Sequence, residues 1–214
     1  MNQIKDLSIE DLGKVVLENI SIEIDRETYD HLEKSLEFLL AFSRDKVIYG
    51  INTGLGPMAQ YKIDNDKLQD LQYNLIRSHA AGVGEKLPDE YVKAAMLVRL
   101  RAIIQGYSGI DPSCITLIRD LINNNVFPFI PEHGGVGASG DLIQLSHLAL
   151  VLIGEGKVNY KGELIETSKV FNQLNLKPIS IKLREGLSLI NGTSVMTGIG
   201  ALNIIKSRQL FHWS

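Results

Sequence analysis

The chain has 214 residues, of which 44% are hydrophobic and 22% charged, as is ordinary for a globular protein. Its formal net charge of -3 argues against a general nucleic-acid binder, which carries a basic excess, and against adhesion to an anionic membrane surface. A single cysteine, Cys114, excludes an internal disulfide; without a signal-peptide core or an apolar run that could span a bilayer, we expect a cytoplasmic protein.

The first half of the chain has the apolar periodicity of amphipathic helices. We expect helices over about 28–43 and 64–78, a third with Pro88 in its first turn, and a fourth that is capped by Asp111 and runs to about Asn124. The third helix is expected to bury one stripe, made of Val92, Met96, Leu100 and Ile103.

The second half begins with an extended stretch around Pro128 and Pro131, followed by a glycine-rich segment over 133–140. A helix over 141–153, a hairpin over 158–165 and a last helix follow. This last helix covers 184–211 and is interrupted at Asn191-Gly192-Thr193.

These elements predict a mainly α fold. We expect an N-terminal mixed region over 1–100 that leads into a long-helix bundle beginning in 101–214. The C-terminus lies inside a helical pattern with no stop signal, so we expect the N-terminal part of a longer protein.

The glycine-rich segment is the strongest local signal for chemistry. Gly135, Gly137 and Gly140 match the dinucleotide pattern G-x-G-x-x-G, but prolines and helices flank them instead of a βαβ unit. A serine-hydrolase elbow fails because Asp141 stands where the second glycine is needed. A glycine-rich helix entry that binds nothing remains open at this point.

Four segments occur in an order typical of one enzyme family. The chain resembles the aromatic amino-acid ammonia-lyase and aminomutase family, and the resemblance covers essentially its whole length. The matching segments are Y-G-I-N-T-G-L-G at 49–56, S-H-A-A-G at 78–82, G-V-G-A-S-G-D-L at 135–142 and N-G-T-S at 191–194.

The resemblance implies that Ala138, Ser139 and Gly140 cyclise to the electrophile 4-methylideneimidazole-5-one (MIO). The amide nitrogen of Gly140 attacks the carbonyl of Ala138, loss of that carbonyl oxygen closes the ring, and loss of the Ser139 hydroxyl leaves an exocyclic methylene. A tightly bent glycine-rich loop suits this closure. No separate organic cofactor, nucleotide or metal is then expected.

The remaining site residues also follow from the resemblance. Tyr49 is expected to take the β-proton, although free tyrosine titrates near pH ~10, and its loop, with Gly56 at the substrate, is expected to act as a lid. Asn191 is expected to hydrogen-bond the MIO and the substrate; the pattern alone also allows a residue at a kink. Ser78 and His79 are expected to face the substrate side chain.

The substrate has two competing interpretations. A Ser-His pair at 78–79 is typical of histidine ammonia-lyases. The segments over 56–61 and 132–135 resemble bacterial tyrosine ammonia-lyases that also carry Ser-His, and Gln144 replaces the proline usual in histidine enzymes. The longer match favours elimination from L-tyrosine to give 4-coumarate, with histidine and urocanate as the alternative.

Other classes stay open beside the lyase. They are an aminomutase with the same cofactor, an inactive relative, and an unrelated helical binding domain. The family resemblance also implies a homotetramer, with further active-site residues in a C-terminal half that this chain lacks.

Overall fold

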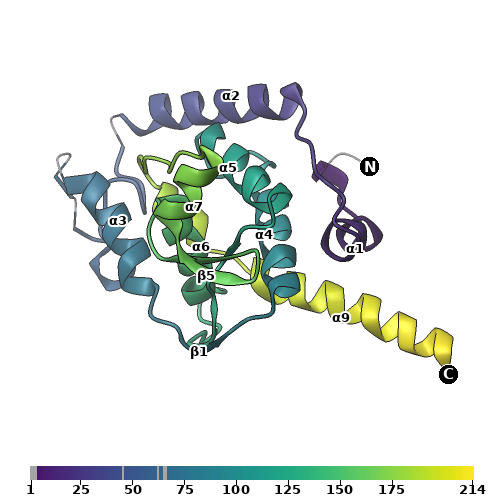
Figure 1. Ribbon diagram of the computed structural model, residues 1–214. Coiled ribbons are helices and arrows are strands. Elements are labelled where there is room, and N and C mark those ends of the chain that lie inside the picture. The colour runs from purple at the N-terminus through teal and green to yellow at the C-terminus, as the bar shows by residue number, and fades with distance from the viewer. Residues whose placement is uncertain (1–3, 45, 62, 65–66) are drawn as a thin grey trace.

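The computed structural model describes residues 4–44, 46–61, 63–64 and 67–214, and most of them are helical. Figure 1 shows packed helices with two small sheets, one with β1 at the bottom of the view and one with β5 near its centre. The α-helices are α1 Ile9–Leu17, α2 Arg26–Ser43, α3 Leu68–His79, α4 Asp89–Ile103, α5 Pro112–Asn123, α6 Leu142–Leu152, α7 Thr167–Leu174, α8 Glu185–Ile190 and α9 Ser194–Trp213. Short 3-10 turns lie at Ile4–Asp6 and Gly56–Met58.

Several helices begin as the sequence predicts. The side chain of Asp111 accepts a hydrogen bond from the Ser113 N–H, and α5 starts at Pro112 as expected. The α3 helix begins at Leu68, later than the expected residue 64. The prediction that Pro88 lies in the first turn of its helix is wrong: Pro88 occupies the N-cap position with a ψ of 139°, which is not helical, and α4 starts at Asp89.

The α4 helix is the centre of the core. The predicted stripe is buried, but so are residues on the other sides of this helix, including Lys93 and Arg99. The α9 helix crosses α4 closely, because a Cβ on Gly198 would lie 2.8 Å from the carbonyl carbon of Ala94. The single stripe was therefore too narrow an expectation: α4 is enclosed by α1, α5 and α9.

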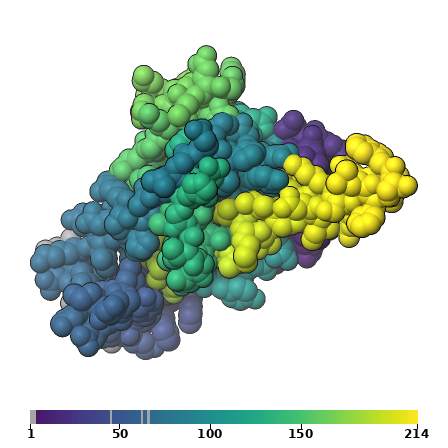
Figure 2. Space-filling model, turned by 90° about the horizontal axis from the view of Figure 1, so that it is seen from below, coloured from purple at the N-terminus to yellow at the C-terminus, as the bar shows by residue number. Residues whose placement is uncertain are grey.

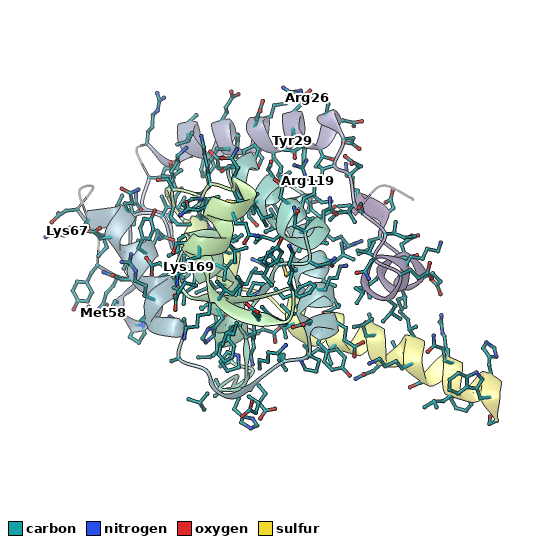
Figure 3. The ribbon with its side chains drawn as sticks, viewed as in Figure 1. Arg26, Tyr29, Met58, Lys67, Arg119 and Lys169 are labelled. Atoms are coloured by element: carbon teal, nitrogen blue, oxygen red, sulfur yellow. The ribbon has the colours of Figure 1, made fainter. Side chains whose placement is uncertain are left out.

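The α2 helix lies across the top of the core in Figure 1 and packs on α5. Tyr29 on α2 and Arg119 on α5 lie beside each other in Figure 3. Nη1 of Arg119 donates a hydrogen bond to the Tyr29 hydroxyl oxygen over 3.2 Å. The same hydroxyl lies 3.1 Å from Oγ1 of Thr116. These polar contacts fix an otherwise largely exposed helix.

The strands form two small antiparallel groups: β1 Val83–Lys86 with β3 Pro131–His133, and β2 Phe127–Pro128 with β4 Lys157–Tyr160 and β5 Glu163–Glu166. Val158 faces Ile165 in the β4–β5 hairpin, which turns at Lys161-Gly162 as predicted. The β1–β3 pair joins the end of α3 to the start of the glycine-rich segment, because β1 follows α3 and β3 precedes that segment.

The α9 helix leaves the body of the molecule, as Figures 1 and 2 show. Its last turns expose large apolar side chains: Leu210 is 63%, Phe211 79% and Trp213 83% exposed. Among the helices that the structure describes, none is both long and apolar enough to cross a membrane. The division expected near residue 100 falls within α4 and stays a prediction.

Candidate active site

The glycine-rich segment ends in an exposed, strained turn just before α6. Ala138 and Ser139 form this turn and are exposed. Ser139 has a φ of 67°, in the left-handed region that a residue with a side chain rarely adopts, and Gly140 follows with a φ of 94°. Such strain persists only where surrounding contacts hold it, and it often accompanies function.

The contacts that hold this turn come from the interruption between α8 and α9. Gly140 pairs with Gly192 in a parallel bridge, and the Asp141 N–H donates to the Gly192 carbonyl over 2.7 Å. A Cβ on Gly140 would lie 2.2 Å from that carbonyl oxygen, so only glycine fits. The structure thus joins two of the sequence motifs, 135–142 and 191–194, directly.

The Asp141 side chain strengthens the same junction. It stands at the N-cap position of α6 but makes no capping bond there. Its Oδ2 instead accepts from the N–H groups of Val195, at 2.8 Å, and Met196, at 3.0 Å, in the first turn of α9. A carboxylate suits a helix N-terminus, so Asp141 caps α9 across the fold.

Asn191 occupies the end of α8 with an extended backbone, φ −88° and ψ 109°. Its N–H donates to the Leu187 carbonyl, and its own carbonyl accepts from Arg99. The residue is exposed beside the bridged Gly192. It therefore lies next to the Ala-Ser-Gly turn in the chain's fold, and its hydrogen bond to the cofactor stays a prediction.

Arg99, on α4, is a part of this site that the sequence reasoning missed. It is 5% exposed; its Nη1 donates to the Asn191 carbonyl over 3.2 Å and its Nη2 to the Ser188 carbonyl. Burial lowers the pKa of Arg99 to about 10, which leaves the guanidinium charged at neutral pH. A charged residue inside an apolar helical pattern was the available signal.

The Tyr49 loop precedes α3 and packs on α8. Tyr49 is 50% exposed, and its hydroxyl oxygen accepts a hydrogen bond from the Gly56 N–H over 3.3 Å. Gly50, with a φ of 75°, leaves no room for a side chain, because a Cβ there would lie 2.6 Å from Leu187. Buried Gln72 donates to the Gly50 carbonyl and accepts from the Leu187 N–H.

Ser78 and His79 end α3. Nδ1 of His79 lies 2.9 Å from the Leu75 carbonyl oxygen. A carbonyl oxygen only accepts hydrogen bonds, so in the neutral ring this contact places the proton on Nδ1 and leaves Nε2 as an acceptor. Ser78 is exposed and also donates to the Leu75 carbonyl, over 3.2 Å.

The segment after His79 approaches the glycine-rich segment. A Cβ on Gly134 would lie 3.2 Å from the Cα of Gly82, which shows how closely the two backbones pass. The Gly82 N–H donates to Nε2 of His147 on α6 over 3.2 Å, and burial lowers the pKa of His147. His147 is thus a half-buried histidine with a structural partner.

The expected site residues therefore fall into connected groups. The turn over 138–140 contacts Gly192 directly, and the Tyr49 loop packs on α8, which ends beside that residue. The segment after His79 passes Gly134, which precedes the turn. Across the residues with described side chains, no hydrogen bond joins Tyr49 or His79 to 138–140. That same part of the chain holds no cluster of metal-ligating residues.

The turn fits the cyclic cofactor that Ala-Ser-Gly implies. Ring closure needs a bent backbone and a free nitrogen on Gly140. The consecutive positive φ angles of Ser139 and Gly140 supply the bend. Within the described chain the Gly140 N–H makes no hydrogen bond, so the nitrogen is not engaged elsewhere.

The mainly α fold, with its Ala-Ser-Gly turn bridged to the Asn-Gly-Thr segment, agrees with the aromatic amino-acid ammonia-lyase and aminomutase class that the sequence resembles. The model of the family described as "Aromatic amino acid lyase" matches residues 7–214, and the chain belongs to that family.

The similarity extends to curated relatives and solved structures. A histidine ammonia-lyase of Macrococcus caseolyticus is 42% identical over 96% of this chain and 41% of its own length. The tyrosine aminomutase of Streptomyces globisporus is 37% identical with a TM-score of 0.86, over 92% of this chain and 37% of that one. The histidine ammonia-lyase of Trypanosoma cruzi is 34% identical with a TM-score of 0.87, over 95% and 40%. This chain spans about two fifths of the relatives' length.

Proposed function

We propose that the protein, in its full-length form, is an ammonia-lyase that eliminates ammonia from an aromatic L-amino acid. The observation that carries this proposal is the left-handed Ser139, held in an exposed turn whose next residue is bridged to Gly192. In the proposed enzyme, Ala138, Ser139 and Gly140 form MIO, an electrophile that makes the substrate amine a better leaving group.

Tyr49 is the proposed base for the β-proton. Its hydroxyl is half-exposed and lies on a loop, where a substrate can approach it. The Gly56 N–H donates to the phenol oxygen over 3.3 Å, which orients the hydroxyl group within the loop. Gly56 then contributes to the substrate side of the loop through its backbone.

Asn191 is proposed to donate its side-chain amide to the cofactor and the substrate. Its backbone is fixed at both ends, by its own N–H bond to Leu187 and by Arg99 on its carbonyl. A side chain on a backbone held in this way starts from a fixed position when charge develops beside it.

L-Tyrosine is the proposed substrate. Because Nδ1 of His79 faces the Leu75 carbonyl, the neutral form of the ring would offer Nε2 as an acceptor to a substrate ring that carries a hydrogen-bond donor, which a phenyl ring lacks. The phenol of tyrosine supplies such a donor. The segments over 56–61 and 132–135 and the presence of Gln144 support this choice.

L-Histidine is the second candidate, because an imidazole N–H supplies the same donor. The named histidine ammonia-lyase relatives favour it. An aminomutase that uses the same site is a variant of the tyrosine proposal, since a tyrosine aminomutase is among the similar structures.

We also propose a homotetramer in the cytoplasm. The family resemblance implies this assembly, and the exposed apolar side chains of Leu210, Phe211 and Trp213 on α9 offer a surface that another subunit could cover.

The test offers the full-length protein tyrosine, histidine and phenylalanine side by side, and follows 4-coumarate, urocanate, cinnamate and any β-amino acid. The proposal expects 4-coumarate to form with the highest kcat/KM. Urocanate as the main product would establish the second candidate, and a β-amino acid would establish the aminomutase. Absence of turnover with all three would refute the lyase.

A further inference from the structure

Arg99 is a buried cation with an unusual set of partners. Its side chain reaches from α4 to the end of α8, where two of its nitrogens donate to the carbonyls of Ser188 and Asn191. The last carbonyls of a helix lack partners within it and carry partial negative charge, so a cation there is favourable. Arg99 therefore satisfies two of the carbonyls at the C-terminal end of α8.

No carboxylate offsets this buried charge within the described part of the chain. The ion pairs found there do not include Arg99, and its Nε is buried without a partner. Burial without an ion pair is costly, as the pKa of about 10 reflects. An apolar side chain would fill the space at lower cost, so stability alone does not account for an arginine at this position.

Gly192 packs closely between the Arg99 guanidinium and the backbone of Gly140. A Cβ on Gly192 would lie 2.5 Å from Nη1 of Arg99, and a Cβ on Gly140 would lie 2.2 Å from the Gly192 carbonyl oxygen. The Gly192 carbonyl in turn accepts from the Asp141 N–H. A shift of the guanidinium is thus transmitted through Gly192 to the backbone on both sides of the Gly140–Asp141 peptide bond.

We propose that Arg99 is a positioning residue for ring closure in the Ala138-Ser139-Gly140 turn. It acts through Gly192 and does not touch the reacting atoms. The inference rests on the proposed function, because it concerns formation of the same electrophile.

The chemical step loses two waters. The Gly140 nitrogen bonds to the Ala138 carbonyl carbon and its hydrogen moves to the oxygen. That oxygen leaves as water with the hydrogen of the Ser139 nitrogen as a C=N bond forms. The Ser139 hydroxyl leaves with the Ser139 Hα as the second water, and a C=C bond forms. The role of Arg99 is to hold the Gly140 nitrogen where the first bond can form.

The test measures ring closure directly, by intact mass of full-length Arg99→Lys and Arg99→Gln variants at set times after synthesis. Arg101→Gln is the matched control, since Arg101 lies on the same helix with an exposed side chain. Because a misplacement of about 1 Å can cost ~100-fold in rate, we expect closure to slow by about that factor in Arg99→Gln. We expect the closure rate to be partly restored in Arg99→Lys, which keeps the charge but cannot donate to both carbonyls at once as the guanidinium does.

The outcomes separate the two proposals. A wild-type protein without the two-water deficit refutes the proposed function itself. A wild-type deficit with an equally rapid and complete deficit in both Arg99 variants overturns the inference. If Arg99→Gln does not fold, Arg99→Lys decides: a folded lysine variant, with the thermal midpoint of Arg101→Gln, that closes at the wild-type rate refutes the positioning role, and slowed closure supports it.

Discussion

Replacement of Asp141 by alanine tests how the cofactor turn is attached to α9. Asp141 accepts from the N–H groups of Val195 and Met196, so the alanine variant leaves the first turn of α9 without its cap. Loss of a side-chain cap costs about 1–2 kcal/mol. A change of that size alters a local opening equilibrium by roughly 5–30-fold.

The assay is amide hydrogen exchange in the full-length protein, on a peptide that covers Val195 and Met196. We expect exchange in this first turn to accelerate by roughly 5–30-fold in Asp141→Ala, because opening free energy sets the rate. Asp141→Asn keeps an acceptor oxygen and loses the charge, so its effect is expected to be smaller.

The matched control is Asp25→Ala, because Asp25 caps α2 by the same chemistry, with Oδ1 2.7 Å from the Thr28 N–H. That variant is expected to accelerate exchange in α2 and leave α9 unchanged. Unchanged exchange at Val195 and Met196 in Asp141→Ala would refute the capping argument.

The other predictions concern single side chains. Burial lowers the pKa of His147 in the folded protein. On acidification the unfolded state therefore takes up a proton at this histidine before the folded state does, and the fold should lose stability as the pH falls below about 6.5. In a denaturation series against pH, His147→Gln should lack this part of the stability loss that wild type shows. Tyr49→Phe should lower kcat by roughly 100–10,000-fold with little change in substrate affinity, and an effect on KM alone would make Tyr49 a binding residue. His79→Leu should shift the tyrosine-to-phenylalanine ratio of kcat/KM toward phenylalanine by roughly 2–10-fold; a constant ratio would place His79 away from the substrate ring. Gly140→Ala should show no two-water deficit, since its Cβ would collide with the Gly192 carbonyl, and a complete deficit would contradict that geometry.

Local signals in the sequence were sufficient for much of the fold. The Asp111-Pro112 pair marked the start of α5, the Lys161-Gly162 pair marked the hairpin turn, and Asn191-Gly192-Thr193 marked the break between α8 and α9. The first two are short-range effects of capping and of a positive φ, and at the third the extended backbone of Asn191 ends α8. The short elements α1, α7 and β1 were missed, because few residues carry their periodicity.

The long-range contacts of the site could not be predicted in this way. Gly140 and Gly192 each lie in a motif that the sequence analysis identified, yet their pairing depends on how α6, α8 and α9 pack. The hydrogen bond from the Val195 N–H to the Asp141 side chain depends on the same packing, and so does the one from buried Arg99 to the Asn191 carbonyl. Periodicity identified α4 as a helix, but it could not indicate that the helix is enclosed by neighbours.

The most direct test of the account is the intact mass of the full-length protein, followed by the mass of a peptide that contains residues 138–140. We expect a mass deficit of two waters located at Ala138-Ser139-Gly140. In Ser139→Ala, which has no hydroxyl to expel, we expect a deficit of at most one water. A full-length, folded wild-type protein whose mass equals that of the uncyclised sequence would contradict it.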